Sequence, residues 1–171
     1  MLPIETERLI LRQLTPADAL GMFELDSDPL VSKYLHQKPF TSIDQAREVI
    51  DYILQQYHDY GIARWAVIEK ETNQFIGWSG LKLITEPINN HINFYDIGYR
   101  LISRFWGKGY ATESARPALQ YGFDVLQANT IYGMCAVENT ASANVLQKIG
   151  LQYVEDFGHR GIPHKWFKIA K

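Results

Sequence analysis

Two glycines separated by one lysine, Gly107-Lys108-Gly109, stand between a strand-like run that ends at Leu101 and a helix-like pattern that starts near Thr112. Glycine adopts backbone conformations with positive φ at little cost, so such a turn can direct several N–H groups toward one point. The N-terminus of the following helix adds more free N–H groups and a partial positive charge. A chain that folds around this turn therefore has a candidate anion site suited to phosphate, where Arg104 and Lys108 supply formal charge.

Two common phosphate-binding motifs do not fit this turn. A Walker A loop continues with Ser or Thr after its Gly-Lys pair, but here Gly109 follows Lys108. A dinucleotide fingerprint that starts at Gly107 requires a third glycine at the position of Thr112. On these residues alone, the alternative to a phosphate site is a purely structural glycine turn.

The rest of the chain alternates strand-like and helix-like patterns. The clearest helix follows Ser42, a good cap residue, and repeats apolar residues at helical spacing up to Tyr60, before Gly61. Pro117 lies early in a later helix and is expected to kink it or to confine regular hydrogen bonding to the residues after it. The order of elements predicts an α+β fold, a mostly antiparallel sheet with helices on both faces. The expected strands are 8–14, 63–70, 75–84, 93–101, 130–137, 151–157 and 164–170, and the expected helices are 15–25, 42–60, 112–127 and 140–149.

The composition is that of an ordinary globular domain. The 171 residues are 46% hydrophobic and 21% charged, which excludes a disordered chain. Without a repeat or a linker, we expect a single domain over residues 1–171. The net charge of −2 argues against nucleic acid or an anionic membrane as a partner. No stretch approaches the roughly 18 apolar residues of a membrane span, and we expect a soluble cytoplasmic protein.

Charge and cysteine content add two further points. Residues 1–99 carry 8 basic and 14 acidic side chains, whereas residues 100–171 carry 9 basic and 5 acidic side chains. This division is either chance or the sign of an anionic ligand on the C-terminal half. Cys135 is the single cysteine, which excludes an intrachain disulfide and a CxxC metal site, so no metal is expected. A structural thiol is favoured over a reactive one.

The glycine turn also matches a family motif. Arg104-x-x-Gly107-x-Gly109 resembles the Gln/Arg-x-x-Gly-x-Gly/Ala acetyl-CoA motif of the GCN5-related N-acetyltransferase (GNAT) family. More of the chain is similar to the branch of that family that contains the ribosomal-protein-alanine N-acetyltransferases (RimJ/RimL-like). The segments that match, in order, are Glu7–Arg12, Asp28–Leu35, Asp96–Leu101, Trp106–Glu113 and Asn139–Gly150.

The resemblance implies the GNAT fold and acetyl-CoA as co-substrate. Strand Asp96–Leu101 is expected to splay from its parallel neighbour Thr130–Val137, with the pantetheine arm in the gap. The pyrophosphate is expected on the turn, and Asn139 is expected to hold the pantetheine arm or its loop. The residues implied in cofactor binding are Tyr99, Arg100, Leu101, Arg104, Phe105, Trp106, Gly107, Lys108, Gly109, Tyr110, Ala111, Thr112 and Asn139.

The reaction implied by the resemblance is direct transfer, in which a neutral primary amine attacks the thioester carbonyl. A lysine-type amine has a pKa of about 10.4 and needs a base more than an α-amine does, whose pKa is about 7.7–8.0. Asp96 is the expected base, acting directly or through a water. The alternatives are that Asp96 is a surface or strand-pairing carboxylate, or that no side chain acts as base. His36 and His164 are weaker candidates.

The position expected to assist the departing thiolate differs from the common family pattern. Many family members place a tyrosine seven residues after the motif asparagine as an acid, and that position is Leu146 here. The alanine N-acetyltransferase branch favours a serine three residues after the asparagine, and Ser142 matches it. Ser142 is therefore expected near the cofactor sulfur, and its alternative role is to support the first turn of a helix.

The acceptor pocket is expected in the acidic N-terminal half. Its aromatic candidates are Tyr34, Trp65 and Trp78, with Tyr57 and Phe40 beside them, and the alternative is that these rings belong to the core. The leading function is acetylation of a primary amine, on a protein N-terminus or a small molecule, by a monomer or homodimer. The alternative is a non-catalytic acyl-CoA-binding or sensing domain of the same fold.

Overall fold

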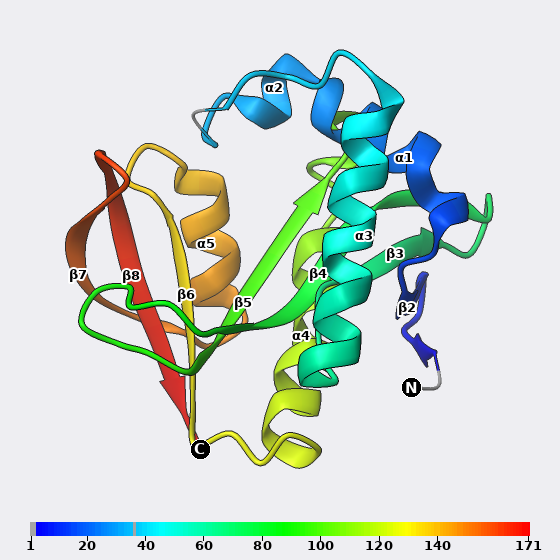
Figure 1. Cartoon of the computed structure of the whole chain (residues 1–171). Helices are drawn as coiled ribbons and strands as arrows, with labels where there is room; N and C mark the ends of the chain where they lie inside the picture. The colour runs from blue at the N-terminus through cyan, green and yellow to red at the C-terminus, as the bar shows by residue number, and fades with distance from the viewer. Residues whose placement is uncertain (1–2, 36) are drawn as a thin grey trace.

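The computed structural model describes residues 3–35 and 37–171, and its strands form one mixed sheet (Figure 1). The strand order is β1-β2-β3-β4-β5-β6-β8-β7, and all neighbours are antiparallel except β5 and β6. The expected α+β class with a mostly antiparallel sheet is confirmed. The strands are β1 (Ile4–Glu5), β2 (Leu9–Gln13), β3 (Trp65–Glu69), β4 (Gln74–Ile84), β5 (Phe94–Leu101), β6 (Thr130–Ala136), β7 (Gln152–His159) and β8 (Ile162–Ala170).

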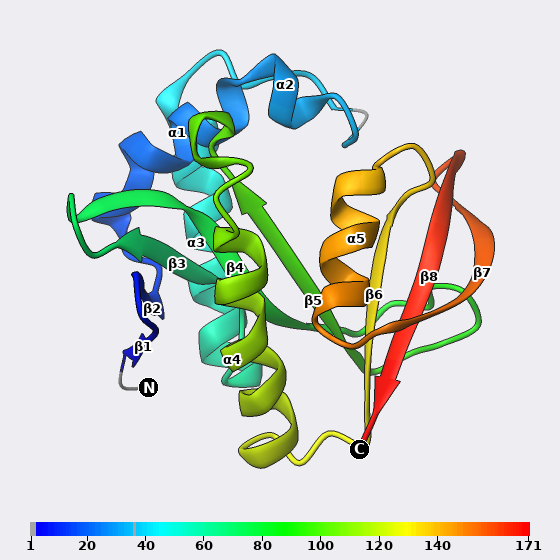
Figure 2. The ribbon, with the colours of Figure 1, turned by 180° about the vertical axis from the view of Figure 1, so that it is seen from behind.

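Helices cover both faces of the sheet. The α-helices are α1 (Ala19–Ser27), α2 (Pro29–Ser32), α3 (Ile43–Tyr60), α4 (Tyr110–Asp124) and α5 (Thr140–Lys148). α3 crosses one face, in front of the strands in Figure 1, whereas α4 and α5 cover the other, in front of the strands in Figure 2. α1 packs against α3, and α1 and α2 lie over the end of the sheet toward which β5 runs.

Local signals fix the ends of α3. Ser42 and Gln45 form a capping box at its start, and Gly61 ends it with a φ of 70°, the left-handed conformation that favours glycine. Ala46, Ile50 and Ile53 on its inner face are buried. The strong periodicity of this segment therefore predicts both the element and its boundaries.

α4 differs from the expectation at both ends and at Pro117, and its last residue is Asp124 in place of residue 127. It begins at Tyr110 rather than near Thr112, because Gly109 adopts a φ of 83° and forms the cap. It also runs through Pro117 instead of becoming regular only after it, so that part of the expectation is wrong. Small buried side chains on the inner face, such as Ala118, hold the helix against the sheet despite the hydrogen bond that proline cannot make.

β5 and β6 pair over a short stretch and then diverge (Figure 1). Tyr95 lies opposite Ile131 and Asp96 opposite Tyr132, and within the described residues the ladder between these strands ends there. β4, in contrast, follows β5 along its whole length. In the part of the chain that the structure describes, the backbone of residues 99–101 therefore has no strand partner on the β6 side. The expected splayed parallel pair is confirmed.

Two kinds of feature are absent from the described residues. None of their helices combines the length and apolar character needed to cross a membrane. Over residues 3–35 and 37–171, no group of three or more His, Cys, Asp and Glu side chains is arranged to hold a metal ion.

Candidate active site

A cavity of about 480 Å³ opens beside the gap between β5 and β6. Its wall combines the unpaired end of β5, the glycine turn, the first turns of α4 and α5, and the α2 segment. Residues from distant parts of the sequence therefore meet at one place. The expected site residues on this wall are Tyr34, Tyr99, Arg100, Leu101, Phe105, Trp106, Gly107, Gly109, Tyr110, Ala111, Thr112, Asn139 and Ser142.

The glycine turn has the backbone conformation that the sequence predicts. The φ angles of Gly107 and Gly109 are 74° and 83°. A Cβ added to Gly107 would meet no atom within 4 Å, so backbone conformation rather than crowding explains this glycine. The Glu113 N–H donates to the Gly109 carbonyl at 3.0 Å, and the N–H groups that precede it in α4 face out of the helix end. Turn and helix end together have the geometry of an anion site.

The two cations of the turn lie outside the cavity wall. Arg104 forms an ion pair with Glu24 of α1, and both side chains are 47% exposed. The Nζ atom of Lys108 lies 5.1 Å from the centroid of the Phe105 ring. The charge of Arg104 is therefore compensated within the chain, whereas the motif predicts a charge that is available to a ligand.

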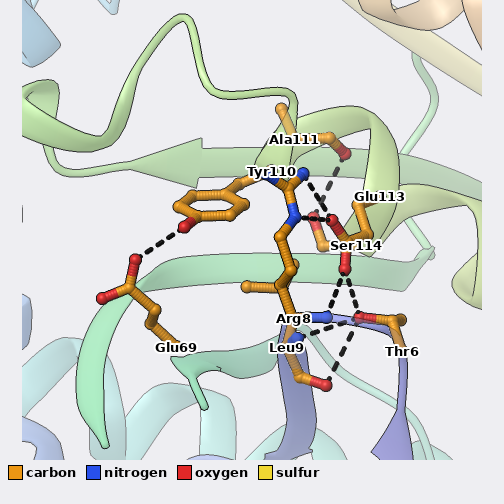
Figure 3. A network of polar contacts seen from close by, with 8 residues as sticks. All are labelled: Thr6, Arg8, Leu9, Glu69, Tyr110, Ala111, Glu113 and Ser114. Atoms are coloured by element: carbon orange, nitrogen blue, oxygen red, sulfur yellow. Dashed lines mark hydrogen bonds and ion pairs between the residues drawn. The ribbon is translucent and has the colours of Figure 1, made fainter. Parts of the chain in front are cut away.

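Polar contacts anchor the first turn of α4 to the segment before β2 and to the end of β3 (Figure 3). The Glu113 carboxylate accepts hydrogen bonds from Thr6 Oγ1 at 2.6 Å and from Arg8 Nε at 2.7 Å. The Tyr110 hydroxyl donates to Glu69 at 2.6 Å, and the Arg8 guanidinium lies 4.5 Å from the centroid of the Tyr110 ring. We refer to these contacts of Arg8, Glu113, Tyr110 and Glu69 as the α4 anchor.

The α4 anchor sets the charge state of Glu113. Burial acts to raise the pKa of this carboxyl, but hydrogen bonds from Thr6 and Arg8 outweigh burial and leave the pKa below its ordinary value. The carboxylate is therefore ionised and paired at the helix end that borders the glycine turn. No local sequence pattern predicts these contacts, because 105 residues separate Arg8 from Glu113.

Tyr99 and Ser142 meet from β5 and α5. The Tyr99 hydroxyl donates to the backbone carbonyl of Ser142 at 2.7 Å, and the two hydroxyl oxygens are 3.2 Å apart. Asn139 caps α5 by accepting a hydrogen bond from the Ser142 N–H at 3.0 Å. Leu146, at the position of the common family tyrosine, is only 1% exposed and belongs to the core. Burial raises the pKa of Tyr99, so its hydroxyl is protonated at neutral pH.

Asp96 lies in the interior and not on the surface, which corrects one of its alternative roles. It is 5% exposed, and its Oδ2 atom forms an ion pair with Arg64. Arg64 also donates to the Asp96 carbonyl at 2.5 Å. Burial raises the pKa of Asp96, while the neighbouring guanidinium opposes the shift. The Oδ1 atom is buried and has no hydrogen-bond partner among the described residues.

The position of Asp96 relative to the cavity is informative. Asp96 is not part of the cavity wall, but it is the residue at which the pairing between β5 and β6 ends. It therefore lies at the closed end of the gap, whereas Tyr99 and Ser142 lie on the wall. Arg64, its partner, was not identified from the sequence, although a lone arginine before the apolar β3 run was a usable signal.

The expected acceptor residues separate into different places. Tyr34 lies on the cavity wall. Trp65 is 1% exposed and packs edge-on against Tyr121 in the core, so its assignment to the acceptor pocket is wrong. The Trp78 ring packs against two guanidinium groups. Its centroid lies 5.5 Å from Cζ of Arg64 and 5.0 Å from Cζ of Arg100.

Tyr57, Phe40 and His164 lie apart from the cavity wall. The Tyr57 hydroxyl donates to the Arg64 carbonyl, and Phe40 packs partly buried against the core. His164 lies on β8, opposite Ala136 of β6, and is not on the cavity wall. His36 lies outside the described residues.

Comparison with known proteins identifies the family. The model of the "Acetyltransferase (GNAT) domain" family matches residues 8–152. This chain belongs to the GNAT acetyltransferases. An N-acetyltransferase of Bacillus licheniformis is 36% identical over 147 residues, which cover 86% of this chain and 80% of that relative. This GNAT chain is therefore an acetyltransferase.

Solved structures agree with this GNAT fold. An acetyltransferase of the GNAT family from Bacillus anthracis superimposes with a TM-score of 0.81 and 26% identity, and covers 99% of this chain and 98% of that structure. The ribosomal-protein-S5-alanine acetyltransferase of Vibrio fischeri has a TM-score of 0.79 at 17% identity and shares the fold over 99% of this chain and 97% of its own.

Proposed function

We propose that this GNAT acetyltransferase transfers the acetyl group of acetyl-CoA to a primary amine, on a protein N-terminus or a small molecule. The observation that carries the proposal is the cavity itself. It joins the glycine turn, the unpaired backbone of β5 and the hydroxyl of Ser142 in one wall. We further propose that residues 1–171 act as one domain.

Successive parts of the cavity wall suit successive groups of acetyl-CoA. The turn around Gly107 and Gly109, with the end of α4, offers N–H groups to a pyrophosphate. The free backbone of residues 99–101 offers donors and acceptors to the amide groups of a pantetheine arm. Among the relatives, one from Aspergillus fumigatus is named an acetyl coenzyme A transacetylase and is 31% identical over 159 residues.

The proposed chemistry is direct attack. The amine nitrogen forms a bond to the acetyl carbon, the carbon–sulfur bond breaks, and its electron pair leaves with the sulfur. The proton that the nitrogen loses balances the one that the sulfur gains. Asp96 is the proposed base, acting through a water. Its Oδ1 atom has no hydrogen-bond partner among residues 3–35 and 37–171, and the residue lies at the closed end of the gap. Ser142 is proposed to face the sulfur.

The acceptor is proposed to enter beside Tyr34. Relatives differ in what they acetylate, since an Escherichia coli relative with 27% identity over 150 residues is named spermidine N(1)-acetyltransferase. A protein N-terminus would need the base less than a lysine-type amine, because an α-amine has a pKa of about 7.7–8.0 and loses its proton more readily. The chain acts as a monomer or homodimer in this proposal.

A panel of primary amines with free-thiol detection tests the proposal. We expect turnover with at least one class of acceptor, and saturable binding of acetyl-CoA. The non-catalytic sensor is the outcome favoured by tight acetyl-CoA binding without turnover on any peptide N-terminus, polyamine or small amine. In a complex with coenzyme A, a pyrophosphate that does not contact residues 104–109 would overturn the proposed binding mode.

The Asp96→Asn variant tests the base. We expect kcat to fall by about a hundredfold or more with a lysine-type amine, and by less with an α-amine. Coenzyme A affinity, measured by calorimetry, should stay near the wild-type value. Asp156→Asn, on exposed β7, is the matched control. Equal losses with both amines would argue that Asp96 acts only as the partner of Arg64.

A further inference from the structure

Tyr99 connects the two walls of the cavity through a side chain. It lies on β5 beyond the point where β5 leaves β6, and its hydroxyl reaches the first turn of α5. The ring is partly buried, and both Tyr99 and Ser142 line the cavity. The contact therefore spans the gap in which the pantetheine arm is proposed to lie.

The hydrogens of this contact can be assigned to their acceptors. Tyr99 has one hydroxyl proton, which it donates to the Ser142 carbonyl at 2.7 Å. The Tyr99 oxygen, 3.2 Å from Ser142 Oγ, remains an acceptor. The Ser142 hydroxyl can therefore donate its proton to the Tyr99 oxygen, to the neighbouring Cys135 sulfur or to a group inside the cavity. Its backbone is held on the other side, because the Ser142 N–H donates to Asn139.

We propose that Tyr99 is a positioning residue that holds Ser142 so that the Ser142 hydroxyl donates a hydrogen bond to the departing sulfur. Ser142 is the catalytic residue in this arrangement, and Tyr99 acts through it. The inference rests on the proposed function, since it requires coenzyme A in the cavity. It also explains how the chain works with Leu146 buried in the core at the position of the common family tyrosine.

The Tyr99→Phe variant removes the hydroxyl and keeps the ring that lines the cavity. Loss of the positioning should weaken the hydrogen bond from Ser142 to the charged sulfur, so we expect kcat to fall about tenfold to a hundredfold. KM for acetyl-CoA should change by less than about twofold, since the ring stays in place. Tyr153→Phe is the matched control, because that hydroxyl bonds to Asp156 on β7, away from the cavity wall.

A double-mutant cycle separates action through Ser142 from an independent effect. If Tyr99 acts through Ser142, Tyr99→Phe should lower kcat no further in a Ser142→Ala background. Ser142→Thr, which keeps a hydroxyl, should recover part of the loss. Equal effects of Tyr99→Phe in both backgrounds would overturn the inference, as would wild-type kcat in the single variant.

A second measurement needs no acceptor. In the binary complex, a hydrogen bond from Ser142 to the sulfur should lower the pKa of the coenzyme A thiol, which can be followed by ultraviolet thiolate absorbance. We expect this pKa to rise by about one unit in Tyr99→Phe and in Ser142→Ala, which corresponds to a tenfold loss in thiolate preference. Burial raises the pKa of Cys135 to about 11, and titration of each variant without coenzyme A gives the contribution of this thiol.

The two measurements distinguish the two ways to fail. If no amine is acetylated by the wild type, the proposed function fails, while the thiol titration still tests the inference. If the wild type is active and bound coenzyme A titrates identically in the wild type and Tyr99→Phe, the inference fails and the proposed function stands. Unchanged melting temperatures would establish that Tyr99→Phe is folded.

Discussion

Gly98 lies beside the candidate site at a position where the interior has no room for a side chain. Arg64 is buried beside Gly98, and a Cβ added there would lie 2.7 Å from Arg64 Nη2 and 2.9 Å from Cζ. The guanidinium has little freedom to move, because it pairs with Asp96 and donates to the Gly80 carbonyl. Glycine at position 98 thus leaves the space that the buried guanidinium of Arg64 occupies.

Gly98→Ala is therefore expected to destabilise the protein. Overpacking of this kind costs about 1–3 kcal/mol, and it should move the Arg64–Asp96 pair. The urea midpoint of unfolding measures the effect. Gly158→Ala is the control, since a Cβ at that strand position meets nothing within 4 Å. A midpoint for Gly98→Ala equal to that of Gly158→Ala would contradict the steric argument.

At the scale of elements, the α4 anchor places an acidic residue at the same helix end that forms the proposed pyrophosphate site. Glu113 belongs to the first turn of α4, and Arg8 pairs with it at 2.6 Å. Without that pairing, the carboxylate would oppose a bound anion at the helix end. Arg8 therefore does more than fasten α4 to β2, because it also compensates this charge.

The Arg8→Gln variant tests this compensation. An unpaired charge near a helix end changes binding by about 0.3–1 kcal/mol, so the Kd for coenzyme A should rise roughly twofold to fivefold. The double variant Arg8→Gln, Glu113→Gln should return toward the wild-type Kd. Arg47→Gln, which breaks an exposed pair with Asp44 on α3, is the control. A double variant that binds as weakly as Arg8→Gln would favour a purely structural anchor.

The same anchor predicts a pH dependence of stability. The pKa of Glu113 is lowered in the folded state, so the native protein binds fewer protons there than the unfolded chain. Its contribution is therefore present above the ordinary pKa of glutamate and is lost as the pH falls through the lowered value. Glu113→Gln should be less stable than the wild type at neutral pH, and the difference should shrink in acid. Denaturant unfolding at several pH values measures it.

The elements that the sequence predicts are those with a local cause. α3 has a period, a capping box and a terminal glycine, and the glycine turn has two residues that need positive φ. The expectation for Trp65 fails because β3 lies between two strands and is buried along its entire length. Its continuous apolar run therefore does not indicate which side chains point to which face of the sheet. The partners of Asp96 and Glu113 come from distant segments, and no local pattern specifies them.

At the scale of the whole molecule, one sheet runs through the chain from β1 to β8. The buried side chains of α1, α3, α4 and α5 belong to one hydrophobic core, and part of this core also lines the cavity. This continuity favours a single cooperative unit, as proposed for residues 1–171. The division of charge along the sequence is only partly expressed in the fold, because Arg100 and Arg104 pair with Asp26 and Glu24 of the acidic half.

Unfolding should therefore be a single transition. Far-ultraviolet circular dichroism and tryptophan fluorescence are expected to give coincident curves in denaturant. Coenzyme A at about 100 times its Kd should stabilise the whole protein by about 2.7 kcal/mol. Two resolved transitions, with only one shifted by coenzyme A, would contradict the single-unit proposal.

The short ladder between β5 and β6 gives the molecule a line of mechanical weakness. Two residue pairs join a half-sheet of β1 to β5 to a half-sheet of β6, β8 and β7, whereas every other inner seam is longer. Backbone hydrogen bonds resist bending least at this seam, and the side chains of the common core hold the two halves together there. A ligand that bonds to both edges would act as a missing strand and stiffen the sheet across its weakest point.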